Sequence, residues 1–384
     1  MKTAEFVPVL LWELLVEILS WLLVKTLMQF RCVCKSWKSL ISNDKAFEKL
    51  HLHISAKNKH VLVTLREPDY DVEDEDHYLI MCPVRRFVED PSFMIDEEGS
   101  CTLKGEYNIV GSCNDLVCFH LIDSNFRTGE FWVRLWNPIT RLWSNKSPTF
   151  DIDNRVSFGF DYDDLRDTYK VVGLSDYFCW RGWKLVTMVY CMGDSCWRNI
   201  QGDPGFRLSL KQNYGQFVGG CLNWLAYDDS NHHCNHQNHH TDLERFVIVS
   251  FDMRKETYSS LSLPEVISEV SNIEIELSVF ENCLCLFQDC KRIHFDVWQM
   301  REYGVRESWT RLVTLSYEHL QCDVYMFYPL PLMCLSEDGD ILMLFENQNR
   351  DVILYNLRDN SEKHIQLPDN KRWLNANSYV QSLV

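Results

Sequence analysis

The residues from Val9 to His51, VLLWELLVEILSWLLVKTLMQFRCVCKSWKSLISNDKAFEKLH, decide how this chain is organised. Apolar residues first recur three and four positions apart, with Glu13 and Glu17 on the other side, which is typical of an amphipathic helix. The recurring positions are Leu11, Leu14, Leu15, Ile18, Leu19 and Leu22, and a second run repeats the spacing at Leu27, Phe30, Cys34 and Trp37. Because two or three short helices in about 40 residues support only a small core, we expect a partner surface to cover the excess apolar face.

The order EILSWL followed by VKTLMQFRCVCKSWKSLI resembles the F-box, the helical module by which substrate receptors dock onto a Skp-family adaptor of a cullin-based ubiquitin ligase. The resemblance implies that one set of residues contacts the adaptor or forms the fold that presents the contact, and helix core is the alternative for each of them. The set is Leu14, Leu15, Ile18, Leu19, Leu22, Val24, Lys25, Leu27, Phe30, Val33, Cys34 and Trp37. Leu11 and Leu23 stand where the family usually has proline, which leaves the local fold less preorganised.

The formal net charge of −17 is unevenly distributed over the 384 residues. Residues 1–55 contain seven Lys and Arg against five Asp and Glu, a charge of +2, which leaves −19 on the remainder. Phosphate binding needs a basic surface, so the charge argues against nucleic acid as a partner.

Sixteen cysteines are scattered through long apolar segments, which favours reduced, buried thiols over a disulfide framework. The apolar run from Leu10 to Val24 has fifteen residues and is interrupted by Glu13 and Glu17. It is therefore too short and too polar for a membrane span, and we do not interpret it as a signal peptide. We expect a protein of the cytoplasm, the nucleus or both, without a membrane partner.

Short strand signals dominate from about Ile109 onward, in five paired segments. Each second segment contains an aromatic residue before a polar turn, and these anchors are 54, 61, 47 and 57 residues apart. The anchors are Trp136, Tyr190, Phe251, Trp298 and Tyr355. Two hairpins in roughly 50 residues give four strands, the size of a kelch-like β-propeller blade, although spacing alone leaves a β-sandwich as the alternative.

Strands are also expected at 60–65 and 78–82, and at the terminal SYVQSLV, residues 378–384. A blade made from both ends of the chain would close the ring and leave no open sheet edge, which gives about six blades. The segment 67–77 has seven acidic residues in eleven and is predicted to be a solvated loop.

The body also resembles a known family. GSCNDLVCF, LWNPITRLW, FGFDYDDLRDTYKVVGL, FVGGCLNWLAY, IVSFDMRKETYSSLSLP and VWQMREYGVRESWTRL are similar to the successive motifs of the F-box-associated interaction domain, found behind the F-box in a large plant receptor family that includes S-locus F-box-like proteins. The resemblance spans about residues 105–312. The resemblance does not indicate which protein is the substrate or which residues bind it.

Metal-binding and catalytic motifs are weak. The segment NHHCNHQNHH offers His232, His233, Cys234, His236, His239 and His240 as weak candidate ligands for zinc or copper. Their spacing is irregular, so a solvated loop is favoured, and we expect neither a resident metal nor a cofactor.

Cys283, Cys285 and Cys290 are predicted to be buried strand cysteines, and the aspartates of FDYDDLRD (160–167) to form a hairpin turn. We find no catalytic grouping.

The sequence therefore predicts a mainly β protein with a small all-α N-terminal domain. Residues 1–50 form the helical F-box domain, 51–104 the first strands and the acidic loop, and 105–384 the β-propeller-like domain. The predicted function is that of a non-catalytic substrate receptor, which docks a Skp-family adaptor through the F-box and holds a target protein on the β domain for ubiquitination. The alternative is a propeller that binds a ligand, sugar or metal and whose F-box has lost adaptor binding.

Overall fold

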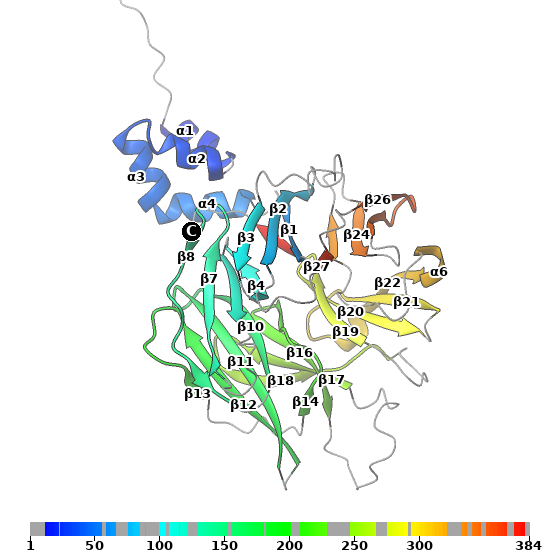
Figure 1. Cartoon of the computed structure of the whole chain (residues 1–384). Helices are drawn as coiled ribbons and strands as arrows, with labels where there is room; N and C mark the ends of the chain where they lie inside the picture. Colours follow the sequence, from blue (N-terminus) through cyan, green and yellow to red (C-terminus); the bar gives the residue numbers. More distant parts are fainter. Residues whose placement is uncertain are drawn as a thin grey trace, which may run out of the picture.

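A computed structural model describes residues 12–22, 24–55, 59–66, 76–84, 89, 100–104, 107–114, 116–121, 130–152, 155–179, 182–200, 208–228, 246–265, 275–290, 293–320, 332–335, 340–346, 351–366 and 372–380. Four helices form an N-terminal head, and the strands after them form a larger body (Figure 1). None of the helices in the described part of the chain combines the length and the apolar content that a membrane span needs.

The described part of the head has four helices, more than the two or three predicted: α1 (Trp12–Ser20), α2 (Val24–Phe30), α3 (Lys35–Asn43) and α4 (Lys45–Ser55). The predicted second run is divided between α2 and α3, because Cys34 has extended backbone at the start of α3. Its small core is formed by Leu19, Leu27, Leu40, Ile41 and Phe47. Asp44 caps α4, because its Oδ1 accepts hydrogen bonds from the backbone N–H groups of Ala46 and Phe47 at 2.9 and 3.0 Å. The ring of buried His51 donates from Nε2 to the carbonyl oxygen of Leu22 at 2.8 Å. This bond ties α4 to the turn after α1. α4 continues to Ser55, beyond the predicted end of the helical domain at residue 50, and the first strand begins at Lys59.

The described strands of the body form six sheets of four or five strands, which are the blades of a propeller. Blade 1 contains β27 (Arg372–Val380), β1 (Lys59–Arg66), β2 (Asp76–Pro83) and β3 (Ser100–Lys104). Blade 2 contains β4 (Tyr107–Cys113), β5 (Leu116–Leu121), β7 (Val133–Asn137) and β8 (Leu142–Trp143). Blade 3 contains β10 (Val156–Asp163), β11 (Thr168–Cys179), β12 (Gly182–Cys191) and β13 (Arg198–Ile200).

The other three blades follow in chain order. Blade 4 contains β14 (Leu208–Leu210), β16 (Cys221–Asp228), β17 (Phe246–Asp252) and β18 (Thr257–Leu261), with β15 (Gln216–Val218) also paired to β16. Blade 5 contains β19 (Ile275–Phe280), β20 (Cys283–Cys290), β21 (His294–Met300) and β22 (Trp309–Ser316). Blade 6 contains β23 (Leu332–Leu335), β24 (Ile341–Glu346), β25 (Asp351–Asn356) and β26 (Glu362–Gln366). The minor elements are β6 (Glu130–Phe131), β9 (Phe150–Asp151), η3 (Arg306–Ser308) and α6 (Tyr317–Leu320).

The predicted repeat corresponds to blades 2 to 6. All five aromatic anchors lie on the third strand of a blade and are buried. In three blades the residue after the anchor starts a tight turn, because its side-chain oxygen accepts backbone N–H groups two or three residues on: these residues are Asn137, Asp252 and Asn356. The predicted hairpin turn at 160–167 is confirmed in the same way, since Asp163 Oδ1 accepts the N–H groups of Leu165 and Arg166.

Ring closure by the chain ends is also confirmed. β27 pairs antiparallel with β1, so the C-terminal strand joins the sheet made by the first strands of the body. β27 in turn contacts β4 of blade 2 and β23 of blade 6, which makes it the innermost strand of blade 1. The strand begins at Arg372, earlier than predicted, and residues 381–384 lie outside the described part.

Neighbouring blades pack face to face through separate apolar clusters. The cluster between blades 3 and 4, for example, contains Leu174 and Val189 of blade 3 with Leu222, Trp224 and Phe251 of blade 4, all completely buried. Each sheet therefore has two buried faces, which explains why the strands have near-continuous apolar runs instead of strict alternation. The stability of the body depends on closing all of these interfaces.

Gly215, just before β15, lies against both Phe158 of blade 3 and Trp224 of blade 4. Its backbone N–H donates to the carbonyl oxygen of Phe158 at 2.7 Å, and a Cβ at this position would lie 2.5 Å from Cε2 of buried Trp224. We expect Gly215→Ala to destabilise the body by about 1–3 kcal/mol because the indole has no space to move. Urea unfolding measures the effect. Gly111→Ala is the matched control, since a Cβ there would meet its nearest neighbour at 3.9 Å; equal losses for the two variants would contradict the steric explanation.

Candidate functional site

The core of the head covers only part of the apolar face of α1. Leu19 is 1% exposed, whereas Leu14 and Ile18 are 47% and 51% exposed, and Trp21 just after the helix is 58% exposed. At about 100° per residue, Leu14, Ile18 and Trp21 fall on one side of α1. We call these three residues the head surface. Large exposed apolar side chains that share one side are typical of a protein interaction site.

The structure divides the predicted adaptor residues by burial. Three are fully buried and form the fold: Leu19, Val24 and Leu27. Four are half-buried and pack around the core: Leu15, Leu22, Phe30 and Trp37. Four are exposed: Leu14, Ile18, Val33 and Cys34. The side chain of Lys25 lies outside the described part, as do Leu11 and Leu23, which replace the family's prolines.

The body does not cover the head surface. α4 is the head helix that lies next to the body, near the ends of β7 and β8, while α1 to α3 lie farther out (Figure 1). Lys45 Nζ of α4 donates to Asp167 Oδ2 in the β10–β11 turn at 2.6 Å. The Lys45 bond lowers the pKa of Asp167, and the Asp167 bond raises the pKa of Lys45. Because both side chains are mostly exposed, this pair orients the head more than it stabilises it.

Comparison with known families agrees with this geometry. The F-box domain matches residues 10–49, and the F-box associated beta propeller domain matches residues 72–384. The chain belongs to the plant F-box proteins with an F-box-associated β-propeller. An F-box/kelch-repeat protein of Arabidopsis thaliana is 30% identical to this F-box protein over 310 residues, 79% of this chain and 78% of the relative. The F-box protein CPR1 of the same plant is 25% identical over 389 residues, 94% of this chain and 85% of the relative.

Solved structures similar to this F-box protein are distant. The SapL1 lectin, solved with alpha methyl fucoside, has a TM-score of 0.41 at 9% identity and covers 80% of this chain and 97% of the lectin. A fucose-specific lectin from Aleuria aurantia has a TM-score of 0.38 at 9% identity, over 77% of this chain and 92% of the lectin. Scores this low support no conclusion about sugar binding by this F-box protein.

Sequence reasoning missed two exposed tryptophans of the F-box. Trp12 is 48% exposed at the start of α1, and Trp21 belongs to the head surface. The available signal for Trp21 was its position three residues after Ile18, which places it one turn farther along the same side of α1. The predicted set followed the leucine spacing of α1 and did not include Trp21.

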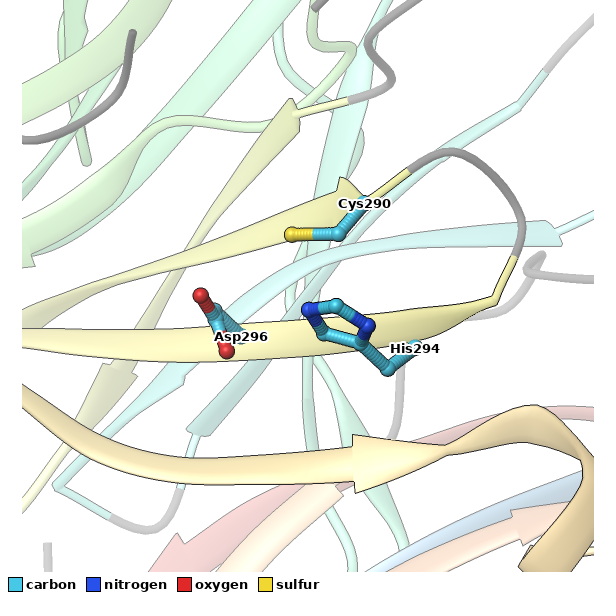
Figure 2. Close-up of side chains that lie close together, drawn as sticks. All are labelled: Cys290, His294 and Asp296. Carbon is cyan, nitrogen blue, oxygen red and sulfur yellow. The ribbon is translucent and has the colours of Figure 1, made fainter.

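Sequence reasoning also missed a group of possible metal ligands in the body of this F-box protein. The predicted candidates at 232–240 lie outside the described residues. Within the described residues, Cys290, His294 and Asp296 place one ligand atom each within 4.8 Å of one another (Figure 2). Cys285 is buried as predicted, but Cys283 and Cys290 are only half-buried. The signal for this group was the short Cys-x₃-His-x-Asp spacing, which spans a hairpin turn.

Proposed function

We propose that this F-box protein is a substrate receptor of a Skp–cullin–F-box ubiquitin ligase. The head docks a Skp-family adaptor, and the propeller holds a target protein. The observation that carries this proposal is the head surface: a family-typical F-box whose helix α1 presents Leu14, Ile18 and Trp21 to solvent instead of to its own body. An adaptor that covers this surface removes apolar area from water. This burial stabilises the complex by about 25 cal/mol for each Å² of apolar surface.

The proposed mechanism is proximity and needs no catalytic residue in this chain. A receptor that holds a target beside the ubiquitin-charged enzyme raises the effective concentration of the target lysines. The Lys45–Asp167 contact joins α4 to the β10–β11 turn of the body, and α1, which carries the head surface, lies farther from the body than α4 (Figure 1). This arrangement leaves the body free to bind a target while the head is docked.

We also propose that the protein works in the cytoplasm, the nucleus or both. Ten cysteines of the described residues are free thiols, some of them exposed. Free thiols persist in reducing compartments, and the ligase partners proposed here work on cytosolic and nuclear proteins. Fractionation of cells that express the full chain from its own promoter would contradict this proposal if the protein were recovered only from secretory compartments.

Binding of the full chain to a purified Skp-family adaptor tests the proposed function. We expect a stable 1:1 complex in size-exclusion chromatography, with affinity measured by calorimetry. A panel of adaptors is needed because Leu11 and Leu23 replace the prolines usual in the family. If the folded chain binds no adaptor in the panel, the receptor function is wrong, and a propeller that binds a ligand through its body becomes the better explanation.

The choice of variants follows from burial. Leu19 is part of the head core, so Leu19→Ala would cost about 2–5 kcal/mol of head stability and would lower adaptor binding even without a direct contact. Trp37 is half-buried and its ring packs against that of Phe30 in a tilted arrangement, with 5.4 Å between the ring centroids, so its loss also disturbs the fold. Substitutions on the head surface are therefore the informative ones.

A further inference from the structure

Cys290, His294 and Asp296 gather on one face of blade 5. Cys290 ends β20 and is the direct cross-strand partner of His294, which begins β21. Asp296 is two residues farther along β21, so its side chain leaves the same face of the sheet. Figure 2 shows the thiol, the imidazole ring and the carboxylate side by side across the two strands. Paired strands hold all three, so the backbone already fixes their relative positions.

The three side chains offer sulfur, nitrogen and oxygen, the donors that zinc accepts. We propose that Cys290, His294 and Asp296 bind one Zn²⁺ ion, with water at the fourth position. Tetrahedral zinc with ligand distances of about 2.0–2.3 Å needs ligand atoms roughly 3.5 Å apart. The three atoms lie within 4.8 Å, so side-chain rotations that move each atom by about 1 Å complete the site.

A second layer of contacts orients the carboxylate. Thr314 on the neighbouring strand β22 faces Asp296, and its hydroxyl donates to Asp296 Oδ1 at 2.5 Å. Nη1 of Arg311, on the same strand, lies 3.5 Å from Asp296 Oδ2. Partners of this kind hold ligating side chains in place around protein-bound zinc. Asp296 itself is 6% exposed, so the carboxylate is fixed at the base of the site while the other two ligands remain accessible.

The alternative is an ordinary hydrogen-bonded group. In that case the Cys290 thiol donates to the carbonyl oxygen of Gln288 at 3.7 Å. Asp296 has its ion pair with Arg311, which is 56% exposed and therefore a weak partner. The contacts with Arg311 and Thr314 involve the carboxylate, whereas zinc would bring all three side chains into one site and deprotonate the thiol.

The proposed zinc ion would lie on the face of the propeller away from the head. Lys45 of the head contacts the β10–β11 turn, which joins the first and second strands of blade 3. Cys290 and His294 flank the turn between the second and third strands of blade 5. In blades of antiparallel strands these two kinds of turn lie at opposite ends. Adaptor docking would therefore leave the open position of the zinc site accessible.

Zinc content and cobalt absorption of the full-length protein test this proposal. The protein is purified without a histidine tag, reduced, stripped with a chelator and dialysed against limiting Zn²⁺. All variants are made in a background in which the histidines and the cysteine of residues 232–240 are replaced by serine, which removes that competing segment. We expect one zinc per chain, and with Co²⁺ a sulfur-to-metal charge-transfer band.

Three substitutions and one control decide the outcome. Cys290→Ser and His294→Ala are expected to lose the bound zinc, and Thr314→Val to weaken zinc binding by about 10–100-fold. Cys283→Ser on the same strand, which faces the other side of the sheet, is expected to keep full zinc content. Circular dichroism confirms that each variant is folded. Absence of zinc from the background protein, or full zinc content in folded Cys290→Ser, would overturn the proposal.

Discussion

Replacing Ile18 with aspartate is expected to weaken binding of a Skp-family adaptor by at least about 30-fold, which corresponds to the 2 kcal/mol or more of an interface hot spot. Ile18 lies at the centre of the head surface and is 51% exposed, so the unbound head tolerates a polar side chain there. In the complex, the carboxylate would be buried against an apolar partner without a counter-charge, which costs more than the lost contact alone. Calorimetry with the full chain and the purified adaptor measures the change.

The matched control is Leu142→Asp. Leu142 is 68% exposed on β8 of the body, so this variant introduces the same chemistry at a comparably exposed position outside the head. Its adaptor affinity should equal that of the unmodified chain. If Ile18→Asp binds the adaptor normally while both proteins are folded, the head surface is not the docking site.

Lys170→Met is expected to destabilise the propeller by about 3–5 kcal/mol, the cost of leaving a buried charge without its partner. Lys170 on β11 is fully buried, with its Nζ 2.7 Å from Asp163 Oδ2 and 3.3 Å from Glu256 Oε1. The ammonium also donates to the carbonyl oxygen of Met253, so one side chain links blade 3 to the β17–β18 turn of blade 4. Removal of the ammonium leaves Asp163 buried and charged. Urea unfolding followed by tryptophan fluorescence measures the loss.

Two further variants separate the charge from the packing. Lys184→Met on β12 removes an exposed lysine and should change stability little. Asp163→Asn combined with Lys170→Met removes both charges and keeps an oxygen that can accept the turn N–H groups of Leu165 and Arg166. We expect the double variant to be more stable than Lys170→Met alone. A single variant as stable as the unmodified chain would show that the ion pair contributes nothing.

The contacts of Lys170 with Asp163 and Glu256 also determine how the stability of the propeller depends on pH. Burial would raise the pKa of Asp163, but the bond and charge of Lys170 hold that pKa below its usual value. Bonds from Arg198 likewise lower the pKa of Glu256. A carboxylate whose pKa is lowered by folding stabilises the protein above its unfolded-state pKa, which is about 4, and this contribution disappears as the pH falls through the lower folded value.

Local spacing was sufficient to predict α1 and the four-stranded repeat. The period of α1 follows from helix geometry, and the aromatic anchors recur because five of the blades bury a bulky residue on their third strand. The turns at Asn137 and Asp163 were predictable because an Asx side chain accepts backbone N–H groups only two or three residues away. All these features depend on residues that are near one another in the chain.

Local spacing did not predict which apolar residues of the head are buried in its core and which are exposed. Leu14 and Leu19 both belong to the apolar pattern of α1, yet they lie about 140° apart around the helix. Leu19 faces the core with Leu27 and Phe47, and Leu14 faces solvent. Only the direction from which α2 to α4 approach α1 decides which of the two is covered.

The sequence by itself therefore determined an F-box followed by a ring of repeated four-stranded blades. The tertiary structure decided which apolar residues of the head remain exposed, which lysine joins blades 3 and 4, and that Cys290, His294 and Asp296 share one face. The physical reason is distance along the chain. Helix period, turn chemistry and blade length depend on neighbours a few residues away, whereas burial and charge pairing depend on groups such as Lys170 and Glu256 that meet only when two blades close together.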